Sequence, residues 1–110
     1  MYFLVLLHEP PDIPGIEVDH EPFVDSLIKQ NVILLGGPLQ ASPESGIWAA
    51  YILSCPSRDD AQAIVARDPL VVHGLAVPTV TAWDLVGVNT AAIASDLAIT
   101  PDDPRLRHLT

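Results

Sequence analysis

The stretch Ala66–Leu75 holds a carboxylate and an imidazole, Asp68 and His73, among mostly apolar residues. Carboxylates and imidazoles are the side chains that enzymes use most often to move protons, so an acid and a histidine in one loop are a candidate site. Asp68 also precedes Pro69, and a proline commonly ends a helix. On these residues alone, both a catalytic site and a helix stop remain open interpretations.

A second histidine, His20, opens the helix that the pattern predicts from about residue 19 to 30. Asp19 is a suitable N-cap, and Pro22 is tolerated in the first turn of a helix. At about 100° per residue, His20 falls in the middle of the apolar stripe of this helix. The stripe consists of Phe23, Val24, Leu27 and Ile28. We therefore expect His20 to point inward and not into solvent.

Four strands and two helices are predicted in order. The strands are expected at residues 1–8, 31–39, 47–54 and 76–86, the helices at 19–30 and from Ser57 to Pro69, and a loop at 68–75. This βαββαβ order predicts a ferredoxin-like α+β fold, in which a four-stranded antiparallel sheet carries both helices on one face. Gly36-Gly37-Pro38 is expected to end the second strand, and a polar turn to follow at 40–46.

Both faces of the predicted strands are apolar, so both need cover. The helices cover one face, and a second copy of the chain is the simplest cover for the other, which predicts a homodimer or a higher homo-oligomer. Residues 1–87 form the expected domain. Residues 88–110 form a C-terminal extension, with a possible short helix at Ala91–Leu97 that docks on the partner protomer.

Composition restricts the classes of protein to which the chain can belong. With 110 residues, one domain is expected. The formal net charge of -9, with only five Lys and Arg residues, argues against nucleic-acid binding. No apolar run is long enough to cross a membrane, and the first residues lack a signal-peptide pattern. A single cysteine, Cys55, agrees with a reducing compartment, so a cytoplasmic protein is expected.

From Met1 to about Val86, the chain resembles the YCII-related (YciI-like) proteins of the dimeric α/β-barrel superfamily. The matching features are the aliphatic strand from Tyr2, His20 at the start of a helix, Gly36-Gly37-Pro38, and Asp68-Pro69-Leu70 followed by His73-Gly74-Leu75. The resemblance implies a dimer with its sheets packed face to face, a cleft beside the helix ends, and a His–Asp pair carried by His20 and Asp68. Most members of this family have no established activity. A few are similar to dehydrochlorinases of aromatic ring compounds, and the superfamily includes muconolactone isomerases and cofactor-free monooxygenases.

These features together predict a cofactor-independent small-molecule enzyme of lyase or isomerase type. His20 is the expected general base and Asp68 its orienting partner, since a carboxylate bonded to one imidazole nitrogen raises the basicity of the other. His73, His8, Gly37 and Pro38 are expected to contact the substrate. No short-spaced ligand pair indicates a metal. Two alternatives stay open: a core histidine that a carboxylate merely satisfies, and a non-catalytic metabolite-binding or accessory dimer.

Overall fold

The computed structural model describes residues 1–40 and 46–92. The elements are β1 (Tyr2–His8), α1 (Glu21–Lys29), β2 (Ile33–Pro38), β3 (Ile47–Ser54), α2 (Arg58–Val65), α3 (Pro69–Val72) and β4 (Val77–Ala82). The strands form one antiparallel sheet in the order β2-β3-β1-β4. The predicted ferredoxin-like α+β fold is therefore confirmed, with α3 as an additional short helix.

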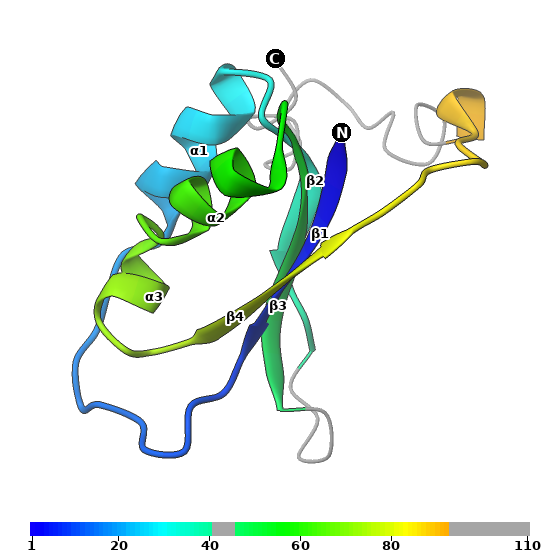
Figure 1. Cartoon of the computed structure of the whole chain (residues 1–110). Helices are drawn as coiled ribbons and strands as arrows, with labels where there is room; N and C mark the ends of the chain where they lie inside the picture. The colour runs from blue at the N-terminus through cyan, green and yellow to red at the C-terminus, as the bar shows by residue number, and fades with distance from the viewer. Residues whose placement is uncertain (41–45, 93–110) are drawn as a thin grey trace.

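The core lies between the sheet and the two longer helices, which Figure 1 shows on the same side of the sheet. Alternate residues of β1 face the helices, and Phe3, Val5 and Leu7 are fully buried there. The helices contribute Leu27, Ala61 and Val65 to the same cluster, together with Ala49, Tyr51 and Leu53 of β3. Buried and more exposed residues thus alternate along the strands, and this alternation determines which side of the sheet the helices cover.

The opposite face of the sheet is also largely apolar. In the strand register, Leu4 lies between Ile52 and Thr81, and Leu6 lies between Ala50 and Thr79. Helices α1, α2 and α3 all contact the other side, so none of the three covers these residues. Cover of this face by a second copy stays a prediction.

Several predicted boundaries are corrected. Gly36, Gly37 and Pro38 are the last three residues of β2, as expected, and they pair with β3. Strand β2 begins at Ile33 instead of Asn31, and β4 ends at Ala82 instead of Val86. Helix α1 begins at Glu21, with His20 and not Asp19 at the N-cap position. Asp19 instead accepts a hydrogen bond from the backbone N–H of Glu21, at 3.2 Å.

Two other expectations fall largely outside the described residues. The polar turn at 40–46 includes residues 41–45, and the short helix expected at 91–97 is described only as far as residue 92. Residues 90–92 are helical. Within the described ranges, no helix has the length and hydropathy required to cross a membrane.

Candidate active site

Asp68 lies at the junction of α2 and α3, where the chain was expected to form only a loop. Its Oδ1 accepts a hydrogen bond from the backbone N–H of Leu70 at 2.9 Å, so Asp68 is the N-cap of α3. Pro69 cannot continue α2, but proline is favourable at the first position of a new helix because no backbone N–H is needed there. The side chain of Asp68 is 0% exposed. Proline therefore ends one helix and begins the next, and Asp68 is enclosed between them.

His20 approaches Asp68 from the start of α1. Its Nε2 lies 2.8 Å from Oδ2 of Asp68, and its side chain is 22% exposed. The imidazole ring stacks on Phe23 one turn later, with the ring centroids 5.8 Å apart. Because an ionised carboxylate only accepts hydrogen bonds, Nε2 carries the proton in neutral His20, and Nδ1 has the free lone pair.

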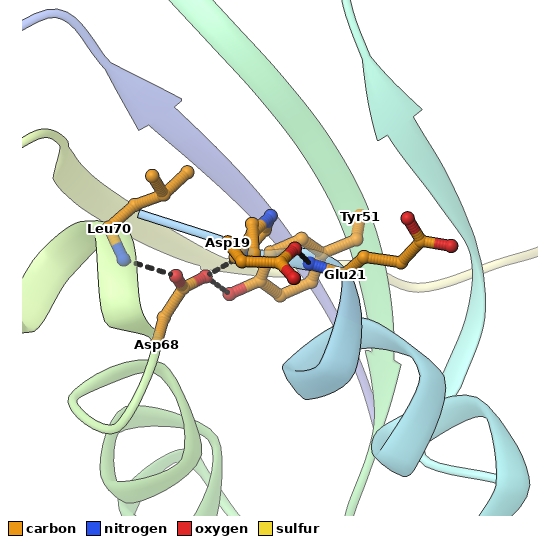
Figure 2. A network of polar contacts seen from close by, with 6 residues as sticks. Asp19, Glu21, Tyr51, Asp68 and Leu70 are labelled. Carbon is orange, nitrogen blue, oxygen red and sulfur yellow. Dashed lines mark hydrogen bonds and ion pairs between the residues drawn. The ribbon is translucent and has the colours of Figure 1, made fainter. Parts of the chain in front are cut away.

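Tyr51 is the third member of this arrangement. Its hydroxyl donates to Oδ2 of Asp68 at 3.0 Å, so this oxygen accepts from both Tyr51 and His20. Figure 2 shows Asp68 between Leu70 on one side and Tyr51 on the other. Burial raises the pKa of Tyr51 well above its ordinary value, and the negative charge of Asp68 and its hydrogen bond add to that rise. Tyr51 therefore keeps its proton and donates a hydrogen bond to Asp68.

The neighbouring strand leaves room for Tyr51 because residue 36 is glycine. Gly36 pairs with Tyr51 across β2 and β3. A Cβ atom at position 36 would lie 2.4 Å from Cβ of Tyr51 and 2.8 Å from the carbonyl oxygen of Ala50. Strand interiors disfavour glycine unless another backbone approaches closely, which is the case here.

A cleft of about 790 Å³ lies beside His20, between α1, β2, β3 and the loop that follows β1. Its walls are mostly aliphatic and include Ile13, Pro14, Ile16, Val24, Ile28, Leu34, Leu35, Leu70 and Leu75. The polar contributions come from His20, Glu21, Tyr51 and the indole of Trp48. None of the described residues lining it is Lys or Arg. The cleft has the volume and the character of a site for a small, largely apolar ligand.

Trp48 reaches this cleft through an irregularity in β3. Leu7 pairs with Ala49 and His8 pairs with Ile47, so Trp48 is an extra residue in the strand. Such a bulge redirects a side chain. The indole Nε1 donates to the carbonyl oxygen of Leu75 at 2.9 Å, which connects β3 to the segment after α3.

The structure separates the other predicted site residues into two groups. Gly37 and Pro38 line the cleft, as does His20. His8 instead forms a hydrogen bond with Oγ1 of Thr79 at 3.0 Å, and His73 is an exposed residue at the C-terminal end of α3. His8 and His73 are not among the residues that line the cleft. The structure thus gives no support to substrate contacts by these two histidines.

The sequence predicted that Tyr51, with Trp48 and Trp83, lies in the sheet core or a dimer interface, with one of the three facing an aromatic ligand. The hydrogen bond from Tyr51 to Asp68 was missed. A signal was present, since Tyr51 shares a strand face with Ala49 and Leu53, and a buried phenol usually has a hydrogen-bond partner. What the sequence lacked was the identity of that partner.

The described residues contain neither a cluster of metal ligands nor an activated cysteine. Among the described residues, no group of three or more His, Cys, Asp or Glu side chains is placed to hold a metal ion. Burial raises the pKa of the Cys55 thiol, and the charge of Asp60 raises it further, so Cys55 is not an activated thiolate.

The fold just described is that of a YCII-type protein. The chain belongs to the YCII-related domain family, which matches residues 1–84. The structure is similar to that of 5-chloro-2-hydroxyhydroquinone dehydrochlorinase (TftG) from Burkholderia phenoliruptrix AC1100, solved in complex with 2,5-dihydroxybenzoquinone. The TM-score is 0.61 and the identity is 22%, over 76% of this chain and 94% of that chain. No curated protein shows a significant sequence match to the chain. The predicted family is therefore confirmed, and the similarity to TftG establishes a shared fold.

Proposed function

We propose that the cleft binds a small ring compound and that His20 removes a proton from it, in a reaction of lyase or isomerase type. The observation that supports this most is the 2.8 Å contact between Nε2 of His20 and Oδ2 of Asp68, at the edge of an apolar cleft. Asp68 orients the imidazole and stabilises the imidazolium that forms, while Nδ1 accepts the proton.

The proposed chemistry needs one base and one acceptor for electrons within the substrate. Nδ1 of His20 takes a proton from the substrate, either from a carbon next to a carbonyl or, in the keto tautomer of a hydroquinone, from a ring hydroxyl. The electron pair of the broken bond enters the ring system as an enolate. In an elimination, the electrons then expel a leaving group such as chloride, which departs with its bonding pair. In an isomerisation, the imidazolium returns the proton to a different carbon. We propose that both routes proceed without a cofactor.

The walls of the cleft favour an uncharged or phenolic ring as the substrate. A volume of about 790 Å³ accommodates a ring compound with its substituents. Among the described lining residues, the charged groups are Glu21 and, when protonated, His20, so no permanent cation is available to bind a phosphate or a carboxylate. The quinone bound to TftG is a molecule of this kind, which supports the proposal.

We also propose that the apolar sheet face is covered by a second copy of the chain. Leu4, Leu6 and Ala50 stay partly exposed on this face beside the buried Ile52, and an apolar sheet face that is left open to water is unfavourable. Sedimentation velocity measures the assembly directly. Leu6→Glu should convert a dimer into a monomer, and wild-type protein that sediments as a monomer at about 100 μM would contradict the proposal.

The function is tested by chloride release from 5-chloro-2-hydroxyhydroquinone. We expect release by the wild type and a loss of about 10²- to 10⁴-fold in His20→Asn, the usual contribution of a general base. His73→Asn is the matched control, since His73 is exposed and does not line the cleft, and it should keep full activity. Tight binding of the compound without any turnover would instead favour the non-catalytic metabolite-binding alternative.

A further inference from the structure

We propose that Tyr51 is a positioning residue, which fixes the carboxylate of Asp68 so that His20 keeps one tautomer with Nδ1 free to accept a proton. The importance of this role for catalysis rests on the proposed function. The hydrogen bonds on which it depends, from Tyr51, Leu70 and His20 to Asp68, are independent of any substrate.

The carboxylate of Asp68 is anchored at both oxygens by different parts of the fold. The backbone N–H of Leu70 donates to Oδ1 at 2.9 Å, and the hydroxyl of Tyr51 donates to Oδ2 at 3.0 Å. Rotation about the last side-chain bond of aspartate is soft, so one anchor alone leaves the plane of the carboxylate poorly defined. Two donors on two oxygens define that plane.

His20 is less suited to define the plane by itself. It stands at the N-cap position of α1 and is 22% exposed, whereas Tyr51 is 3% exposed on a central strand. A hydrogen bond between a buried phenol and a carboxylate is charge-assisted and strong. Tyr51 is the more rigid donor, and it therefore holds Oδ2 of Asp68 in the position where this oxygen accepts the hydrogen bond from His20.

The state of the Tyr51 hydroxyl is consistent with this role. Because the phenol stays protonated, Oδ2 of Asp68 always accepts a hydrogen bond from Tyr51 and never has to donate one. Asp68 then remains an acceptor toward His20, which places the proton of the neutral imidazole on Nε2. Without the hydrogen bond from the phenol, Oδ2 could turn away from His20. His20 would then also populate the tautomer with its proton on Nδ1, which cannot accept a proton at that nitrogen.

Packing alone would not require a hydroxyl at this position. The neighbours of Tyr51 on the same strand face are Ala49 and Leu53, and a phenylalanine ring would fill the same space beside Gly36. A buried hydroxyl is costly unless it has a partner. Tyr51→Phe therefore removes the proposed function of the residue while keeping its shape.

The tautomer of His20 is measured by two-bond ¹H–¹⁵N correlation spectra of the uniformly labelled protein at a pH where the imidazole is neutral. We expect one tautomer in the wild type, protonated at Nε2, and a mixture of tautomers in Tyr51→Phe. Tyr2→Phe is the matched control, because Tyr2 is the only other tyrosine in the chain and lies 39% exposed at the start of β1. This control should leave the spectrum of His20 unchanged.

The kinetic consequence is read from chloride release. Tyr51→Phe should lower kcat by about tenfold or more and leave KM within about twofold, since the ring that lines the cleft is retained and only the hydrogen bond is lost. A single unchanged tautomer in Tyr51→Phe, or mixed tautomers in the wild type, would overturn the proposal. If Tyr51→Phe does not fold, replacement of both tyrosines by the more acidic 3-fluorotyrosine should shift the His20 nitrogen signals, and no shift would overturn it. Fixed tautomers without turnover would count against the proposed function and not against the role of Tyr51.

Discussion

Replacing Asp68 by alanine tests the central hydrogen-bond arrangement through its effect on stability. The side chain of Asp68 is completely buried and accepts from Tyr51, Leu70 and His20. Asp68→Ala removes the acceptor and leaves two donors without a partner, the buried Tyr51 hydroxyl and the part-buried Leu70 N–H. His20 is partly exposed, so water can replace its lost partner.

The expected cost follows from these two donors. A buried donor left without a partner costs about 1–3 kcal/mol, so the two together cost about 2–6 kcal/mol. Removing a buried charge recovers part of its desolvation penalty, which lowers the net expectation to about 2–5 kcal/mol. A domain of this size has about 5–15 kcal/mol of stability, so the variant should fold.

Urea unfolding followed by circular dichroism measures this change. The control is Asp12→Ala, an exposed aspartate whose loss should change the free energy of unfolding by less than about 0.5 kcal/mol. The double variant Asp68→Ala/Tyr51→Phe should cost about 1–2 kcal/mol less than the sum of the single changes, because the orphaned hydroxyl is then absent. A cost below about 1 kcal/mol for Asp68→Ala, or simple additivity in the double variant, would refute the reasoning.

Two further predictions concern the surroundings of Tyr51. Gly36→Ala places a Cβ 2.4 Å from Cβ of Tyr51 and should lower the free energy of unfolding, measured in urea, by about 1–3 kcal/mol. Gly37→Ala is the control, because its Cβ meets nothing within 4 Å, and it should be nearly neutral. Equal effects of the two substitutions would contradict this prediction. The pKa of Tyr51 is raised in the folded state, so the folded protein holds the phenol proton after the unfolded chain has begun to lose it at about pH 10. This contribution to stability is complete below about pH 10 and is lost as the pH rises further, so the wild type should lose stability more steeply with pH than Tyr51→Phe, and parallel curves would argue against a raised pKa.

The fold was predictable because local patterns determine most of it. Alternation in β1 and the helical phase of α1 identify Val5 and Leu27 as buried, and both are in the core. The same phase turns His20 toward the interior, where the structure places it, 22% exposed. The pairing of His20 with Asp68, in contrast, was expected from the resemblance to a family, because 48 residues separate the two and no local rule brings them together.

The features that the sequence did not predict arise where one residue fits two structural roles, or where a contact depends on the exact register of the strands. Pro69 was interpreted as a helix stop, but it is also the first residue of α3, and a four-residue helix has too little periodicity to be detected. The contact of Tyr51 with Asp68 depends on the strand order and on the end point of α2. The direction of Trp48 depends on one extra residue in β3, which no alternation pattern reveals.

The most direct test of the proposed role of His20 is the rate of chloride release from 5-chloro-2-hydroxyhydroquinone by the wild type, His20→Asn and His73→Asn, with binding of the compound measured on the same samples. We expect turnover by the wild type and by His73→Asn, and binding with a rate reduced at least 100-fold in His20→Asn. His20→Asn with the rate of the wild type, or a wild type that binds the ring compound and leaves it unchanged, would contradict the assignment of His20 as the base.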